Sequence, residues 1–263
     1  MTNIVILVKF VISRMRVMLF SALNILLICS MGGATYAASL HTQSAADQAF
    51  SQALPAQLTG VVPSPLNQSV DIARFQQAIA DDLSGRPSAA RSIYDVLKNT
   101  ELSDQIKIPS AINLAALGRF DEAKSAFSRI TLSSDTRESH YAQLWQLWLI
   151  ARNHTGKIIP LKKQLAQVAS NFKMAEPYQQ AIVDLYAGKG SVDAVFKAVQ
   201  AIDKLTDIQK RNVITEATFF TGGYLRYVDQ DKEAELRLYQ REQSQLCLLS
   251  LERPFISHAV GEL

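Results

Sequence analysis

The stretch GRPSAARSIYDVL (Gly85–Leu97) recurs as GRFDEAKSAFSRI (Gly118–Ile130), offset by 33 residues. Glycine, arginine, alanine, serine, an aromatic ring and an aliphatic residue repeat in register. These pairs are Gly85/Gly118, Arg86/Arg119, Ala90/Ala123, Ser92/Ser125, Tyr94/Phe127 and Leu97/Ile130. A repeat of this period is typical of stacked helix pairs. The sequence therefore predicts an all-α fold that serves as a scaffold.

The residues around the two stretches have the spacing of amphipathic helices. Ile72, Phe75, Ile79 and Leu83 lie three or four apart, and Gly85 follows them. A proline suits the first turn of the next helix, which we expect from residue 87. The same helix–turn–helix pattern continues over residues 104–135. We therefore predict antiparallel helix pairs joined by tight turns.

A third pair of this kind is predicted over residues 215–240. Its return helix begins with Glu233-Ala234, which matches Glu122-Ala123 in the earlier pair. Between these pairs, Tyr141, Trp145 and Trp148 share one face of a predicted helix. An aromatic stripe at this spacing is typical of core packing, and a ligand-stacking platform is the less favoured interpretation.

The run LGRFDEA (residues 117–123), followed by Phe127, resembles the centre of a tetratricopeptide repeat. In that motif a glycine permits the tight turn and a small alanine lets two helices approach closely. The resemblance implies a degenerate tetratricopeptide-like α-solenoid of stacked antiparallel helix pairs. The tryptophan common near the start of such repeats and the terminal proline are missing. A generic antiparallel helical bundle stays the alternative.

Residues 139–259 resemble the NlpI-type adaptor lipoproteins of the enterobacterial envelope. The resemblance is carried by LWQLWL, LYAGKGS, FFTGGYLR, DKEAE and the terminal FISHA segment. It implies an adaptor without activity of its own that docks periplasmic proteases and cell-wall hydrolases. It also implies a homodimer.

The amino terminus has the pattern of a secretory signal. Basic residues precede the apolar run VMLFSALNILLICSM (residues 17–31), and small residues lead to a predicted cleavage site after Ala37. An uncleaved anchor, which would associate the protein with the membrane, is the alternative. Lipidation of Cys29 is disfavoured because Ile28 stands where a lipobox needs a small residue. We predict a signal or anchor over 1–37, a flexible Pro/Ser/Gln-rich segment over 38–70, a helical repeat domain over 71–260, and a periplasmic location.

Net charge argues against nucleic acid as a partner. The chain carries 27 basic and 24 acidic side chains, but Lys9, Arg14 and Arg16 lie in the predicted signal, which has no acid. The rest of the chain is therefore formally neutral and lacks a bulk field that would attract phosphates.

The sequence also gives no sign of catalysis, metal or cofactor. Motifs such as GxSxG, HExxH and CxxC are absent, and the four histidines are scattered through the sequence. We therefore predict neither enzyme activity nor a metal site nor a cofactor. A hydrolase with an unrecognised site is the remaining enzymatic hypothesis.

A solenoid binds extended peptides or partner helices on its concave face, which the first helix of each pair lines. The repeat register places ten candidate contact residues there: Phe75, Ile79, Asp82, Gln105, Ile108, Ile112, Glu216, Phe219, Arg226 and Tyr227. Arg226 with Tyr227 is the preferred contact pair, since both residue types are frequent at interface hot spots. The alternative is an exposed arginine beside a core tyrosine.

The functional prediction is a secreted, non-enzymatic adaptor that recruits or assembles envelope proteins. Its expected partners are wall hydrolases, proteases, or pilus or secretion components. The alternative is a membrane-anchored structural subunit of an envelope assembly, in which the amino-terminal helix is retained.

Overall fold

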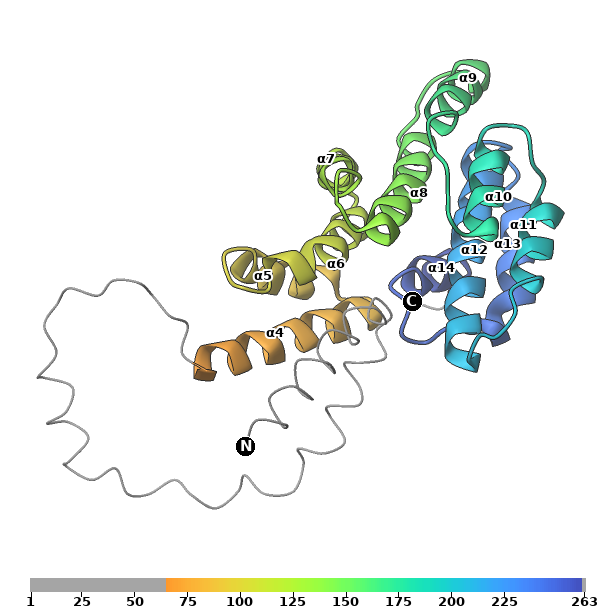
Figure 1. Ribbon diagram of the computed structural model, residues 1–263. Coiled ribbons are helices and arrows are strands. Elements are labelled where there is room, and N and C mark those ends of the chain that lie inside the picture. The colour runs from red at the N-terminus through yellow and green to blue at the C-terminus, as the bar shows by residue number, and fades with distance from the viewer. Residues whose placement is uncertain (1–64, 262–263) are drawn as a thin grey trace, which may run out of the picture. The chain divides into compact units, whose positions relative to one another are not determined.

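The computed structural model describes residues 65–261 (Figure 1). The predicted signal or anchor and most of the predicted flexible segment, residues 1–64, lie outside the described residues. The chain divides into two units, Met1–Val70 and Asp71–Leu263, and the second is described by itself below.

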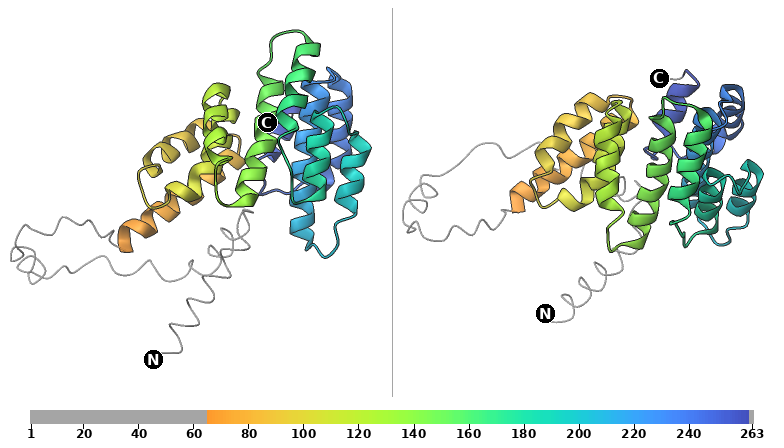
Figure 2. Two further views of the ribbon diagram at one scale, coloured as in Figure 1. Left: turned by 45° about the horizontal axis from the view of Figure 1, so that its top comes forward. Right: turned by 90° about the horizontal axis from the view of Figure 1, so that it is seen from above.

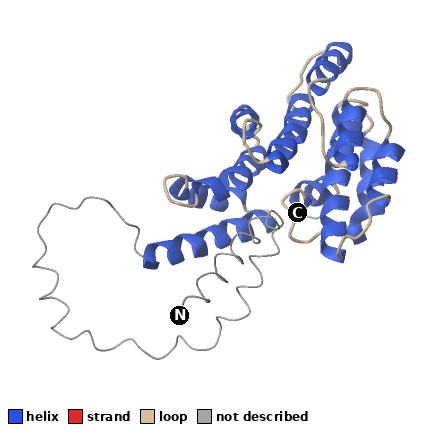
Figure 3. Ribbon diagram, in the orientation of Figure 1, coloured by secondary structure: helices blue, strands red, loops and turns tan. Residues whose placement is uncertain are grey.

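Within residues 65–261 every regular element is helical, which confirms the all-α prediction (Figure 3). The helices are α4 (Pro65–Leu83), α5 (Pro87–Leu97), α6 (Ser103–Ala116), α7 (Phe120–Ile130), α8 (Thr136–Arg152), α9 (Ile158–Ala169), α10 (Pro177–Tyr186), α11 (Val192–Gln200), α12 (Asp207–Tyr227), α13 (Lys232–Glu242), the 3-10 helix η1 (Gln243–Gln245) and α14 (Arg253–Ala259). None of these described helices is long and apolar enough to cross a membrane.

Helix α4 begins earlier than the sequence predicted. The expected boundary between flexible segment and helical domain lay at residues 70 and 71, but the helix starts at Pro65. Proline is tolerated there because the first turn of a helix needs no backbone N–H donor.

Side-chain caps fix several helix starts. The side chain of Asp135 accepts hydrogen bonds from the first turn of α8, and Ser191 and Asp231 do the same for α11 and α13. Thr206 forms a reciprocal capping box with Gln209 at the start of α12. These caps satisfy backbone donors that the helix itself leaves unpaired.

The sequence repeat is also a structural repeat. The alanine, aromatic and aliphatic positions of both stretches are buried in α5 and α7: Ala90, Tyr94, Leu97, Ala123, Phe127 and Ile130. The recurring serines are exposed, and each donates to the carbonyl four residues earlier: Ser92 Oγ to Ser88 O and Ser125 Oγ to Asp121 O.

The repeated glycines occupy the same backbone conformation. Gly85 has a φ of 71° and Gly118 a φ of 72°, in the left-handed region that side chains with a Cβ disfavour. They therefore end α4 and α6 in the same way and allow α5 and α7 to turn back.

A small core joins α4, α5 and α6. Its apolar members surround Tyr94, whose hydroxyl donates to Asp82 Oδ2 at 2.9 Å. From α6, Asn113 Nδ2 donates to Asp82 Oδ1 at 2.6 Å and to the Pro87 carbonyl at 2.8 Å. Asp82 therefore links three helices through hydrogen bonds.

The larger core extends from α6 to α14 and is rich in aromatic rings. Trp145 has no exposed surface, its ring stacks on Phe127 at 5.1 Å between centroids, and it contacts Phe219 at 4.9 Å. Trp148 is 4% exposed and stacks on Phe219 at 5.2 Å. The predicted core role of these two tryptophans is confirmed.

Helix α12 is the centre of this core. It contacts α8, α10, α11, α13 and α14, and the two views of Figure 2 show it among these helices. The contact with α8 joins helices far apart in chain order, whereas a solenoid repeat contacts mainly its neighbours. The helices of the C-terminal part thus pack around α12, whereas in a simple stack each pair would contact only its neighbours.

Two adjacent glycines allow this packing. A Cβ added at Gly222 would lie 2.2 Å from Tyr239 Cε1, and one added at Gly223 would lie 2.3 Å from Trp148 Cδ1. Both aromatic rings therefore contact the α12 backbone directly, from α13 and from α8.

We expect Gly222→Ala to destabilise the protein by about 1–3 kcal/mol, because the new methyl group overlaps a buried ring. Denaturant unfolding would measure it. In a Tyr239→Ala background the same change should be neutral or stabilising, since alanine is the better helix former by about 1 kcal/mol. Equal destabilisation in both backgrounds would contradict the packing explanation.

Candidate functional site

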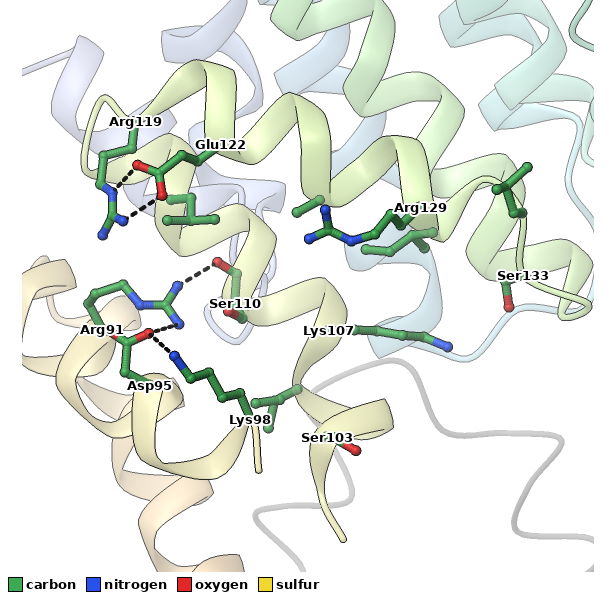
Figure 4. Close-up of a pocket in the computed structure, with 15 residues that line it drawn as sticks. Arg91, Asp95, Lys98, Ser103, Lys107, Ser110, Arg119, Glu122, Arg129 and Ser133 are labelled. Carbon is green, nitrogen blue, oxygen red and sulfur yellow. Dashed lines mark hydrogen bonds and ion pairs between the residues drawn. The ribbon is translucent and has the colours of Figure 1, made fainter. Parts of the chain in front are cut away.

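An open groove of about 640 Å³ lies on the helices that contain the repeated stretches (Figure 4). Helix α6 forms its floor, and α5 and α7 form its two sides. The volume is within the range of ligand-binding pockets. Its lining residues are Arg91, Asp95, Lys98, Ser103, Ile106, Lys107, Ser110, Leu114, Arg119, Glu122, Ala126, Arg129, Ile130, Leu132 and Ser133.

Each side of the groove is the outward face of an amphipathic helix. On α5, Tyr94 and Leu97 are buried while Arg91, Asp95 and Lys98 line the groove. Helix α7 has the same division between a buried apolar face and a polar face. The 3.6-residue period that buries one face therefore places charged residues on the other.

The α5 side is fixed by Arg91. Its Nη1 donates to the Ser110 carbonyl on α6 at 3.1 Å, and its Nη2 lies 3.3 Å from Asp95 Oδ1. Lys98 Nζ lies 4.0 Å from the same carboxylate oxygen. Asp95 is thus shared by two cations, and Arg91 has the shorter contact.

The α7 side has a different pattern of charges. Arg119 Nε and Nη2 donate to the two Glu122 carboxylate oxygens, both at 2.7 Å. This bond raises the pKa of Arg119 and lowers that of Glu122. Lys107 on the floor forms an ion pair with Glu138 of α8.

Arg129 is the cation of the groove for which residues 65–261 supply no partner. Its side chain is exposed, Figure 4 draws no interaction for it, and it makes no ion pair or side-chain hydrogen bond with any residue of the described range 65–261. Beside it, Leu132 is 84% exposed at the end of α7. A free guanidinium and an exposed leucine together are a surface suited to a partner.

Comparison with protein-family models, with curated proteins and with solved structures finds no match. The resemblance to tetratricopeptide repeats and to envelope adaptors therefore stays a prediction from the sequence.

The predicted concave face is largely buried, which corrects the sequence analysis. Asp82 is 8% exposed, Ile112 4% and Phe219 1%, so none of the three is available to a partner. Ile79 and Ile108 are buried as well. The first helices of the pairs pack their apolar residues into the core instead of lining an accessible surface.

Phe75 is half-buried and packs against the small core, whereas Gln105 is exposed. Arg226 forms an ion pair with Glu235 at 3.4 Å. Tyr227 packs edge-on against Trp148 and lies under Arg152, whose Cζ is 5.2 Å from the ring centroid. The preferred contact pair is therefore a half-buried, ion-paired arginine beside a half-buried, packed tyrosine, which differs from the alternative of an exposed arginine beside a core tyrosine.

Glu216, another predicted contact residue, belongs to an internal polar cluster. Gln179 Nε2 donates to Glu216 Oε1 at 2.8 Å, and Tyr178 and Glu252 lie close by. Burial, reinforced by the charge of Glu252, raises the pKa of Glu216 to about 8. Glu252 in turn accepts hydrogen bonds from Tyr141 and Ser250.

This cluster connects α8, α10, α12 and the start of α14. Neighbouring carboxylates, one of them with a raised pKa, also occur in catalytic sites. Here the hydrogen bonds between helices give each polar group a structural role. The described residues contain no group of three or more His, Cys, Asp or Glu side chains arranged to hold a metal ion.

The groove residues were missed by sequence reasoning. The sequence analysis includes Arg119 only as a position of the repeat. Arg91, Lys107 and Arg129 are not among its candidate contact residues. The polar face of α7 can be predicted from its sequence, but the groove cannot, because α5 and α7 form its two sides only through their packing on α6.

Stability should depend on pH through Glu216. Because its pKa is raised from 4.5 to about 8, the folded chain binds more protons than the unfolded chain between these values. The contribution of Glu216 to the free energy of unfolding should be greatest below pH 4.5 and should fall by up to about 5 kcal/mol as pH rises to 8, at about 1.4 kcal/mol per pH unit.

Urea unfolding across this pH range measures the effect. Glu216→Gln should flatten the dependence, whereas Glu233→Gln, an exposed control on α13, should leave it unchanged. Burial also raises the pKa of Asp82, to about 6. Asp82 therefore adds its own dependence of stability on pH, at lower pH, and this is the same in every variant. An unchanged slope in Glu216→Gln would contradict the assignment.

Proposed function

We propose that this chain is a non-enzymatic adaptor of the bacterial envelope that binds partner proteins through the groove between α5 and α7. The observation that carries the proposal is an open groove on which Arg129 has no partner among the described residues and Leu132 is exposed. Interfaces depend on a few arginine and apolar anchors surrounded by polar contacts. The groove has this composition.

The helix pairs are proposed to stack as a degenerate tetratricopeptide-like solenoid. The equal burial and turn geometry of the two repeated stretches support this arrangement for α4–α7. In the C-terminal part, the contact of α12 with α8 departs from it. The groove lies in the part where the repeat is regular.

The adaptor function is tested by affinity capture from envelope extracts with the full chain. We expect Arg129→Glu to lose at least one protein that the unchanged chain retains. Lys124→Glu is the matched control, because Lys124 is exposed on the same helix, lies outside the groove and undergoes the same change of charge. Captured proteins would be identified by mass spectrometry and their binding repeated with purified components.

Leu132→Ala should weaken the same capture, with Ile159→Ala as its control. Ile159 is 78% exposed on α9 and lies away from the groove. Identical capture by all four variants would contradict the adaptor proposal for this surface.

Export is tested separately by amino-terminal sequencing of the native protein. We expect the chain to begin at Ala38, after removal of the signal. A chain that retains its first residues would favour the membrane-anchored structural subunit.

A further inference from the structure

The charges and apolar residues of the groove indicate the chemistry of its partner. Five of the lining side chains are basic and two are acidic. The basic residues are Arg91, Lys98, Lys107, Arg119 and Arg129, and the acids are Asp95 and Glu122. Even with Glu138, which pairs with Lys107 from α8, positive charge is in excess.

This excess lies on both sides of the groove. On α7, Arg129 has no partner within the described range. At the end of α5, Lys98 is 4.0 Å from the Asp95 carboxylate, which is closer to Arg91 at 3.3 Å, so one carboxylate is shared by two cations. The Lys98 and Arg129 side chains are both exposed and free to move toward a ligand. Carboxylates in the groove would therefore meet cations from two helices.

The groove also has apolar lining residues. Leu132 exposes 84% of its surface, Leu114 and Ala126 are half-buried, and Ile106 and Ile130 are buried at 2% and 6% exposed. A ligand made only of charge would leave Leu132 in contact with water, whereas a leucine or phenylalanine side chain would cover it.

The groove is poorly suited to nucleic acid. Single-stranded nucleic acid is bound by basic grooves with aromatic rings on which bases stack. None of the residues that line this groove is aromatic. The excess charge is also small compared with the row of cations that tracks a phosphate backbone.

We infer that the groove binds an acidic peptide segment with apolar side chains, supplied by a partner protein. The carboxylates of the segment pair with Lys98 and Arg129, and its apolar residues cover Leu132 and the half-buried Leu114 and Ala126. This inference rests on the proposed function, because it names the partner chemistry of the same groove. The docking segment of the partner therefore carries negative charge and apolar side chains.

The test is fluorescence anisotropy with the full chain and labelled synthetic peptides. The reference peptide combines glutamates with leucines. Its variants replace every glutamate with glutamine, every glutamate with lysine, or every leucine with serine. We expect binding of the reference peptide to weaken about tenfold or more in each variant and with rising salt.

Substitutions in the chain locate the binding. Arg129→Glu and Lys98→Glu should each weaken the reference peptide about tenfold, whereas Lys124→Glu should not. All three residues are exposed, so circular dichroism should show unchanged folding. If the groove variants bind the reference peptide as well as the unchanged chain, the inference is overturned.

Further probes separate this inference from the proposed function. Stronger binding of the glutamine or lysine peptide at the groove would overturn the acidic assignment but leave the adaptor proposal intact. If an oligothymidylate or phosphatidylglycerol vesicles bind more strongly than the reference peptide, the inference of a peptide ligand is overturned and the ligand is another anion. If no peptide binds and the groove variants also capture the same envelope proteins, both proposals fail.

Discussion

Direct contact between aromatic rings and the backbone of α12 is the constraint on which the larger core depends. Tyr239 from α13 and Trp148 from α8 occupy the space where Gly222 and Gly223 have no side chains. This close approach holds α12 between α13, which follows it, and α8, which is distant from it in the sequence. It also places Phe219 against both tryptophans, so the aromatic core is assembled around one helix.

The buried carboxylate of Asp82 and the half-buried carboxylate of Glu216 complement this packing. Asp82 joins α4, α5 and α6, and Glu216 interacts with residues of α10 and with Glu252 before α14. Burial of such groups is costly unless hydrogen bonds satisfy them. Their donors come from neighbouring helices, so each carboxylate favours one alignment of the helices over others.

Contacts on the buried faces of α5 and α7 hold the two sides of the groove in place. The Tyr94–Asp82–Asn113 network holds α5 on α6, and Phe127 stacks on Trp145 and holds α7 on α8. The two sides of the groove are therefore positioned by buried contacts, while their polar residues face solvent. A preformed surface of this kind loses little conformational entropy when a partner binds.

The sequence by itself determined the helices, their turns and the buried face of each repeated stretch, because helical periodicity and left-handed glycines are local properties. It predicted the tryptophan packing for the same reason. It did not determine which polar residues face solvent: Asp82 and Glu216 were expected at a docking surface, but Asp82 is buried and Glu216 is half-buried in contacts between helices. Only the tertiary structure decided this, and with it the groove, because exposure depends on which helices pack together across the chain.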